Sequence, residues 1–171
     1  LLEDDVTAAA GTTVAPFRLV RGSNDFEIAS ELVADGPILF HFFPFAYTGS
    51  LEKGQGCEAQ VCGFGALLDE FTAAGVRVIG VSHDSPFALK AWAKELDQSY
   101  PFLSDYEWEA AKAFGVLLDE ALGAFRPLNT RGAFLVDTDG TIAYAWSGGD
   151  NLHLLPNPTE CLAAAKSLTA A

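Results

Sequence analysis

The chain has 171 residues, half of them hydrophobic, and a net charge of −13 from 23 acidic and 10 basic residues. This length fits a single domain over residues 1–171 with an ordinary hydrophobic core, in which residues 1–15 are expected to form a loosely held N-terminal arm. The acidic charge disfavours nucleic acid and anionic membranes as partners. No apolar run reaches the roughly 18 residues of a membrane helix. The acidic residues are spread along the chain, which fits either adaptation to high salt or an ordinary acidic surface.

The predicted elements alternate between strands and helices in chain order. The first half holds a strand at 17–20, helical turns at 26–32, a buried strand at 37–43, a loop at 48–56 and a helix at 57–74. The second half holds a strand at 76–82, a helix from 86 to about 96, a strand at 101–103, a helix at 106–114, a hairpin at 131–137 and 141–146, and a helix at 157–168. This order predicts an α/β fold, a central mixed β-sheet with helices on both faces.

Three cysteines are an odd number, whereas a structural disulfide framework normally uses an even number in a shorter secreted chain. Three of the first five residues are acidic, and the segment lacks the basic-then-apolar order of a secretory signal. We therefore expect a cytoplasmic protein whose cysteines serve redox or metal chemistry.

Cys57 and Cys62 carry the most chemical information. Cys57 opens a predicted helix, where unpaired amides and the helix dipole favour a thiolate over a thiol. A thiolate attacks a peroxide oxygen and becomes a sulfenic acid. On an intact helix, side chains five residues apart point about 140° apart, and their Cα atoms lie roughly 8–9 Å apart, beyond the usual limit of about 7 Å for a disulfide. A bridge between Cys57 and Cys62 therefore requires the first helical turns to unwind, and it would be strained and reducible.

Other interpretations of these cysteines stay open. A buried pair of inert cysteines would also fit a core helix. A zinc site is disfavoured, because Cys-x4-Cys lies outside the common ligand spacing and no second ligand pair follows. We expect neither a metal nor a cofactor. His41, in an apolar strand, is expected to be a hydrogen-bonded core histidine rather than a ligand.

Several short segments, each weak alone, are specific in their order. They are Ala15–Leu19, Phe42–Gly49, Cys57–Gly63, Gly80–Phe87, Pro101–Asp105 and Arg131–Asp137. Together they resemble peroxiredoxins of the alkyl-hydroperoxide-reductase/thiol-specific-antioxidant superfamily. The resemblance runs from about residue 11 to the C-terminus and is nearest to the bacterioferritin-comigratory-protein-like, atypical two-cysteine subfamily.

The resemblance implies a thioredoxin-like fold and thiol-dependent reduction of hydrogen peroxide and organic hydroperoxides. It implies that Cys57 is the peroxidatic thiolate, Cys62 the resolving thiol, and Arg131 the cation that stabilises the thiolate and the transition state. Pro44 would shape the loop and shield the thiolate from water, and Thr48 would hydrogen-bond the thiolate and the peroxide. Thioredoxin or a similar dithiol would reduce the resulting disulfide, and a homodimer is compatible with the edge surfaces of this fold.

Without the resemblance, the last three of these residues have plainer interpretations. Arg131 would be a surface arginine that starts a strand, Pro44 a strand terminator and Thr48 an ordinary loop residue. Cys161, in the last predicted helix, is either an alternative resolving thiol or a buried bystander.

One segment departs from the family pattern, in which the cysteine follows the threonine by three residues. Here that position is Leu51, and Cys57 comes six residues later. In one interpretation, Gly54 and Gly56 let the extra segment 51–56 bulge outward, so that Cys57 still meets Thr48. We favour this interpretation because the residues after Cys57 resume the family register.

In the other interpretation, the pocket is rebuilt and peroxide turnover is weak or absent. The chain would then be a redox sensor or interaction protein that keeps the fold and the reactive thiol. It would transmit oxidation to a partner through the melted helix.

Overall fold

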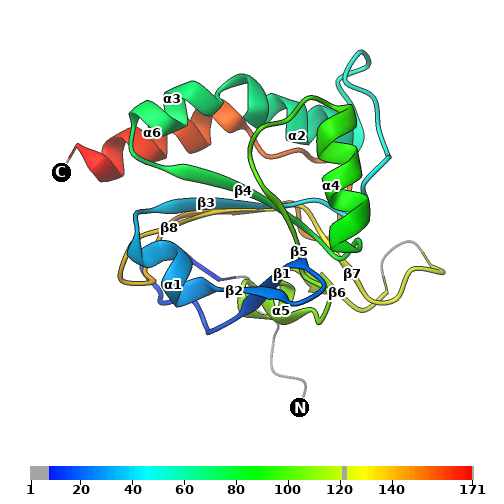
Figure 1. Cartoon of the computed structure of the whole chain (residues 1–171), viewed down its shortest axis with the longest axis horizontal. Helices are drawn as coiled ribbons and strands as arrows, with labels where there is room; N and C mark the ends of the chain where they lie inside the picture. Colours follow the sequence, from blue (N-terminus) through cyan, green and yellow to red (C-terminus); the bar gives the residue numbers. More distant parts are fainter. Residues whose placement is uncertain (1–7, 121–122, 171) are drawn as a thin grey trace.

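Seven strands form one mixed sheet in the computed structural model, which describes residues 8–120 and 123–170 (Figure 1). Their order is β2-β1-β5-β4-β3-β8-β9, and β6 pairs separately with β7. The strands are β1 (Arg18–Gly22), β2 (Asp25–Ile28), β3 (Ile38–Phe42), β4 (Arg77–Ser82), β5 (Phe102–Ser104), β6 (Leu117–Leu118), β7 (Leu128–Asn129), β8 (Gly132–Val136) and β9 (Ile142–Ser147). The helices are α1 (Ala29–Ala34), α2 (Gly56–Ala66), α3 (Leu68–Ala73), α4 (Pro86–Glu95), α5 (Glu109–Ala113) and α6 (Pro158–Thr169).

The centre of the sheet is parallel and its flanks are antiparallel. Strands β3, β4 and β5 run parallel, whereas β8 and β9 continue the sheet on one side and β1 and β2 on the other in antiparallel pairs. Helices α2, α3, α4 and α6 cover one face, and α1 and α5 cover the other (Figure 1). This is the mixed α/β architecture that the alternation of strands and helices predicts.

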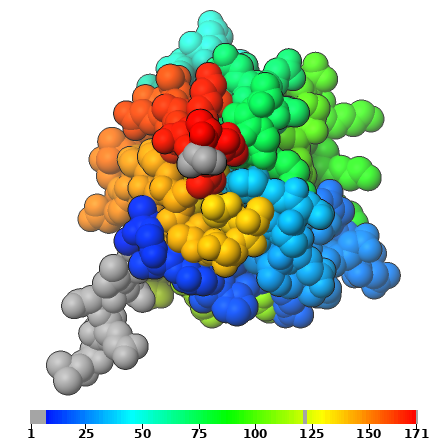
Figure 2. Space-filling model, turned by 90° about the vertical axis from the view of Figure 1, so that its left-hand side faces the viewer, coloured from blue at the N-terminus to red at the C-terminus, as the bar shows by residue number. Residues whose placement is uncertain are grey.

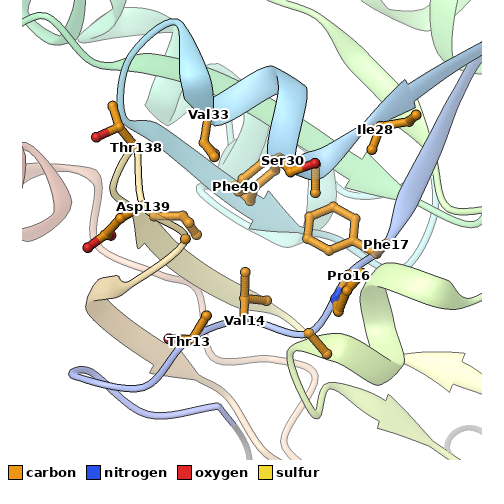
Figure 3. Close-up of a pocket in the computed structure, with 14 residues that line it drawn as sticks. Thr13, Val14, Pro16, Phe17, Ile28, Ser30, Val33, Phe40, Thr138 and Asp139 are labelled. Carbon is orange, nitrogen blue, oxygen red and sulfur yellow. The ribbon is translucent and has the colours of Figure 1, made fainter.

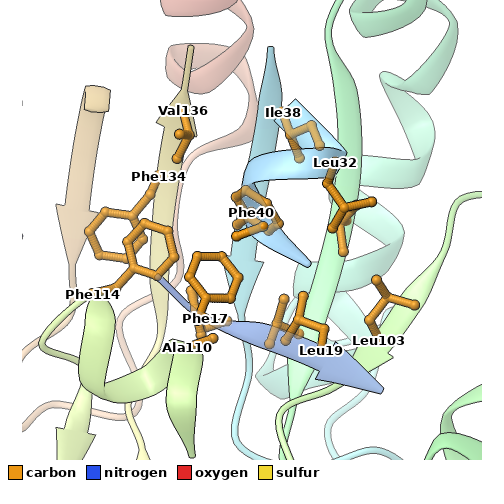
Figure 4. Packing of buried hydrophobic residues seen from close by; sticks show 14 of the residues in the cluster. Phe17, Leu19, Leu32, Ile38, Phe40, Leu103, Ala110, Phe114, Phe134 and Val136 are labelled. Carbon is orange, nitrogen blue, oxygen red and sulfur yellow. The ribbon is translucent and has the colours of Figure 1, made fainter. Parts of the chain in front are cut away.

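Alternation along β3 divides the core into two halves. Ile38, Phe40 and Phe42 pack on the side of α1 and α5, in the cluster of aromatic rings shown in Figure 4. Leu39 and Phe43 pack on the opposite side, with α2, α3, α4 and α6. All five residues of β3 are buried, as expected for a strand covered on both faces.

The N-terminal segment 8–14 is paired with the sheet instead of being loosely held. The Gly11 amide donates to the Ile142 carbonyl at 2.8 Å, and the Val14 amide donates to the Gly140 carbonyl at 3.0 Å. Figure 2 shows this segment in dark blue beside the yellow β8–β9 turn. The expectation of a loose arm is therefore wrong for residues 8–14, while residues 1–7 lie outside the described residues.

A mainly apolar pocket of about 260 Å³ lies between this segment, α1 and the β8–β9 turn (Figure 3). Val14, Phe17, Val33 and Phe40 are among its lining residues. These side chains belong to the core on the side of α1, whereas Cys57 belongs to the core on the side of α2. The sheet therefore separates this pocket from the cysteines.

The helix predicted at 57–74 is two helices, α2 and α3, which meet at Leu67. The backbone of Leu67 has φ −106° and ψ 9°, outside the helical range. Gly63 and Gly65 lower the helix propensity just before this break. The break places Phe64 and Phe71 in one buried site, where their ring centroids lie 6.3 Å apart.

Two further predictions need correction. Residues 26–32 were expected to be helical, but β2 occupies their first half because it pairs with β1 in a hairpin. The helix predicted at 106–114 begins only at Glu109. Trp108 adopts a left-handed conformation with φ 60°, and the Asp105 carboxylate accepts the amides of Ala110 and Ala111, which fixes the helix start at this later position.

Gly80, in the middle of β4, lies where the sheet has no room for a side chain. A Cβ atom there would lie 2.9 Å from Cδ1 of Phe102 and 3.2 Å from Cε1 of Phe43. We expect Gly80→Ala to lower the free energy of unfolding by about 1–3 kcal/mol, because it overpacks this core. Chemical denaturation measures the change. In the matched control Gly22→Ala, the new Cβ meets only Asp25 Oδ2 at 3.4 Å, and equal losses in the two variants would contradict the prediction.

Candidate active site

Cys57 lies in the first turn of α2, at the position that the sequence predicts. Gln55, at the N-cap position of α2, is extended, and its side chain does not cap the helix. The backbone amides of the first turn therefore point out of the N-terminal end of the helix, where Cys57 lies. Cys57 is 1% exposed and packs in the core on the side of α2. The Cys57 sulfur therefore lies at the positive end of the helix dipole and is shielded from solvent.

Arg131, directly before β8, brings a buried positive charge to this sulfur. Its Nη1 atom lies 3.3 Å from Cys57 Sγ and donates to Gln60 Oε1 at 2.9 Å, and its Nε atom donates to the Leu152 carbonyl at 2.7 Å. Arg131 is 5% exposed, and it forms no ion pair within residues 8–120 and 123–170. A buried guanidinium without a carboxylate partner stabilises negative charge that develops beside it, and the Cys57 sulfur lies within its reach.

Gln60 connects this cation to the rest of the protein, a role that the sequence did not reveal. It lies one helical turn after Cys57, so both side chains occupy the same side of α2. Its Nε2 atom donates to the Phe42 carbonyl at 2.9 Å and contacts His41 Nδ1 at 3.1 Å. The spacing of three residues from Cys57 was the available sequence signal, but the partner of the amide could not be read from it.

The extra segment 51–56 forms a small closed loop, in which residues 51–55 are exposed and Gly54, Gln55 and Gly56 line the hollow beside Cys57. Ser50 and Gln55 exchange two backbone hydrogen bonds, at 2.8 and 3.0 Å, which close the loop at its base. Leu51, at the outer side of this base, is 53% exposed. This exposed, closed loop fits the outward bulge that we favoured from the glycines, whereas the meeting of Cys57 with Thr48 that belongs to the same interpretation stays a prediction.

Two glycines make the narrow base of this loop sterically possible. A Cβ atom on Gly49 would lie 2.5 Å from the Gln55 carbonyl oxygen, and one on Gly56 would lie 2.5 Å from Gly49 Cα. Gly49 and Gly56 both have positive φ, at 87° and 72°. The chain therefore returns to the point where it left, and the Glu58 amide donates to the Thr48 carbonyl at 2.9 Å.

Pro44 and Thr48 line a hollow of about 600 Å³ together with Cys57 and Arg131. Pro44 is buried between β3 and the loop, whereas Thr48 is exposed at the rim. The Thr48 hydroxyl donates to the Phe45 carbonyl at 2.8 Å, and in the described part of the chain no hydrogen bond joins it to Cys57. Contact of Thr48 with the thiolate and with peroxide thus stays a prediction.

Cys62 lies on the same unbroken helix as Cys57, and all three cysteines are free. Cys62 is partly buried, and its Sγ atom lies 3.8 Å from Gln98 Nε2. Burial, and then the negative charge of Glu58, raise the pKa of the Cys62 thiol. Helical geometry keeps the two sulfurs from bridging while α2 is intact.

Cys161, in α6, is fully buried beside Tyr144. Burial raises the pKa of this thiol from an ordinary 9.0 to about 12. The group is therefore a neutral thiol at physiological pH.

His41 is buried and hydrogen-bonded, as predicted for a core histidine, and it stacks on Phe64 with ring centroids 4.2 Å apart. Its burial lowers its pKa to about 3, so the ring is neutral. Across residues 8–120 and 123–170, no three His, Cys, Asp or Glu side chains are grouped in a way that could hold a metal ion. The helices of the same residues are all too short or too polar to cross a membrane.

Comparison with known proteins identifies the family. The family model described as AhpC/TSA family matches residues 11–145. A putative peroxiredoxin of Mycobacterium tuberculosis is 33% identical over 129 residues, which cover 75% of this chain and 79% of that protein. Peroxiredoxin Bcp of Escherichia coli is 33% identical over 110 residues, which cover 64% of this chain and 67% of that protein.

The fold agrees with these sequence relationships. The crystal structure of peroxidoxin BcpB from Mycobacterium tuberculosis superposes with a TM-score of 0.77 at 29% identity, covering 94% of this chain and 97% of that one. The fold is thus the thioredoxin-like fold of peroxiredoxins, with Cys57 and Arg131 side by side. The chain belongs to the AhpC/TSA family and is a peroxiredoxin, a thiol-dependent hydroperoxide reductase.

Proposed function

We propose that this peroxiredoxin reduces hydrogen peroxide and organic hydroperoxides through a sulfenic acid on Cys57, which Cys62 then resolves. The observation that carries the proposal is the contact of 3.3 Å between Arg131 Nη1 and Cys57 Sγ in a buried site. Further support comes from the hollow that opens from this pair to the surface, with Pro44 and Thr48 in its lining.

In the first step, the Cys57 thiolate attacks one oxygen of the peroxide, and an S–O bond forms as the O–O bond breaks. The departing oxygen takes up a proton and leaves as water or an alcohol. Arg131 stabilises the negative charge as it shifts from sulfur to the leaving oxygen. Pro44 excludes water from the sulfur, and Thr48 turns its hydroxyl toward the bound peroxide.

In the second step, the Cys62 sulfur attacks the Cys57 sulfur and displaces the sulfenic oxygen as water, so that a disulfide forms. Both sulfurs must approach to about 2 Å, which an intact α2 does not permit. The first turns of α2 therefore unwind before this step. Thioredoxin or a similar dithiol then reduces the strained disulfide by thiol–disulfide exchange. The cytoplasm, where such dithiols keep thiols reduced, is the compartment that we propose.

The first prediction concerns peroxide consumption by the reduced protein, followed by stopped-flow mixing. We expect a rate constant far above that of a free thiol, and a loss of about a hundredfold or more in Arg131→Lys, because lysine cannot keep the Leu152, Gln60 and Cys57 contacts together. The matched control is Arg21→Lys, since Arg21 is an exposed arginine paired with Glu27.

A wild-type rate constant no better than that of a free thiol would exclude the peroxidase. It would favour the second candidate, a redox sensor that uses the same fold. The observation that favours this candidate is the Thr48 hydroxyl. It donates its hydrogen bond to the Phe45 carbonyl instead of to the Cys57 sulfur.

The second prediction concerns the resolving thiol. We expect Cys62→Ser to leave the first oxidation intact but to accumulate sulfenic acid on Cys57, because no thiol on α2 remains to displace it. Trapping with a dimedone reagent and peptide mass spectrometry locates the acid. Cys161→Ser is the matched control and should still form the disulfide. Sulfenic acid on Cys62 or Cys161 instead would overturn the assignment of Cys57.

The third prediction concerns Cys161. Alkylating reagents react with thiolates, and burial keeps Cys161 a thiol until the pH approaches about 12. We therefore expect iodoacetamide at pH 9 to leave Cys161 unmodified in the native protein and to modify it after unfolding in denaturant, as read by mass spectrometry. Modification of native Cys161 as fast as Cys62 would contradict this and would restore Cys161 as an alternative resolving thiol.

A further inference from the structure

A buried network of polar groups extends from the active-site cation to the backbone of α2. Its side chains are Gln60, His41 and Tyr100, and we call it the Gln60–His41–Tyr100 network. It begins at Arg131 Nη1, which donates to Gln60 Oε1, and it ends where the Tyr100 hydroxyl meets the Val61 carbonyl at 2.7 Å. Between these ends, His41 contacts Gln60 at 3.1 Å and Tyr100 at 3.1 Å.

The direction of each hydrogen bond in the network follows from its two ends. Tyr100 has one hydroxyl proton, which it donates to the Val61 carbonyl, so its oxygen accepts the proton on His41 Nε2. His41 Nδ1 is then unprotonated and accepts from Gln60 Nε2, whose other proton goes to the Phe42 carbonyl. The neutral Nε2–H tautomer of His41 thus satisfies every donor and acceptor in the network. The lowered pKa of the buried ring agrees with this assignment.

The network encloses the turn that the proposed function requires to unwind. Arg131 contacts Cys57 at the start of this turn, and Tyr100 holds the Val61 carbonyl, one residue before Cys62. His41 and Tyr100 are both tied to the sheet, since His41 lies in β3 and Tyr100 lies two residues before β5. Unwinding that extends as far as Val61 therefore breaks the bond between Tyr100 and Val61.

The helix itself offers little resistance to unwinding. Two glycines inside α2, Gly63 and Gly65, lie just after Cys62 and lower the helix propensity relative to alanine. The helix also starts without a side-chain cap. Tertiary contacts therefore supply most of the stability of this turn.

We propose that Tyr100 and His41 are positioning residues that hold the Cys57–Cys62 turn closed and so set the rate of disulfide formation. This inference rests on the proposed role of Cys62. A closed turn keeps Cys57 against Arg131 for the first oxidation, and each opening exposes the sulfenic acid to Cys62. The network thus determines how long the sulfenic acid waits, and with it how often a second peroxide converts the acid to a sulfinic acid.

The test removes one oxygen atom. Tyr100→Phe keeps the ring but deletes the bond to the Val61 carbonyl and the acceptor for His41 Nε2. We expect amide hydrogen exchange in the reduced protein to accelerate about fivefold to tenfold across residues 57–62, as expected for the loss of one net hydrogen bond. In Tyr144→Phe, the matched control, the deleted hydroxyl bonds Cys161 rather than α2, and exchange in residues 57–62 should be unchanged.

The kinetic consequence separates a positioning role from general loosening. In Tyr100→Phe, conversion of the sulfenic acid to the disulfide should accelerate by the same factor, and the yield of sulfinic acid at a given peroxide concentration should fall. The rate constant of the first oxidation should stay within about twofold of wild type, because Tyr100 touches neither Cys57 nor Arg131.

Two results would overturn the inference. One is unchanged exchange across residues 57–62 in Tyr100→Phe, and the other is equal acceleration in Tyr100→Phe and Tyr144→Phe. A wild-type protein that fails to react with peroxide would instead refute the proposed function. The exchange measurement needs only the reduced protein, so it decides the role of the network separately.

Discussion

The site depends on one electrostatic constraint, a buried guanidinium for which the described part of the chain provides no carboxylate partner. Arg131 donates hydrogen bonds to a backbone carbonyl, a side-chain amide oxygen and the Cys57 sulfur. Two of these acceptors are neutral, and in the proposed cycle the Cys57 thiolate is the group that balances the charge. Segments far apart in the sequence, α2, the start of β8 and the region around Leu152, are held together by this one side chain. In the proposed cycle, oxidation to a neutral sulfenic acid leaves this cation uncompensated. The loss of charge balance destabilises the closed site and favours its rearrangement after the first oxidation.

The two halves of the site differ in rigidity. Arg131 and His41 lie in or beside central strands whose residues are fully buried and paired on both sides. Cys57 and Cys62 lie on a glycine-rich helix without a side-chain cap. A strand paired on both sides thus presents the cation to a helix that the proposed cycle requires to unwind. Placement of the charge and the proposed opening of the thiol-bearing turn thus depend on separate elements.

Local patterns were enough to predict much of this arrangement. The apolar run of β3 and the placement of Cys57 at a helix start both depend on nearby residues. Arg131 lies 74 residues from Cys57, so only the family resemblance pointed to their contact. The break at Leu67 and the pairing of β2 escaped prediction because tertiary packing overrode the helical pattern. The bond from Tyr100 to Val61 joins a loop to a helix backbone, and no periodicity in the sequence marks such a contact.

The contact between Gly49 and Gly56 has a consequence for how the chain accommodates its extra residues. The segment from Ser50 to Gln55 closes on itself by backbone hydrogen bonds. The chain therefore enters α2 at Gly56, next to Gly49, where it left for the loop. Residues 51–53 lie beyond the base of this loop and are exposed, whereas Gly54, Gln55 and Gly56 return to line the hollow beside Cys57. Despite a spacing that departs from the family pattern, Cys57 thus still lies at the start of α2 beside Arg131. The two glycines at the neck are the residues that this close return requires.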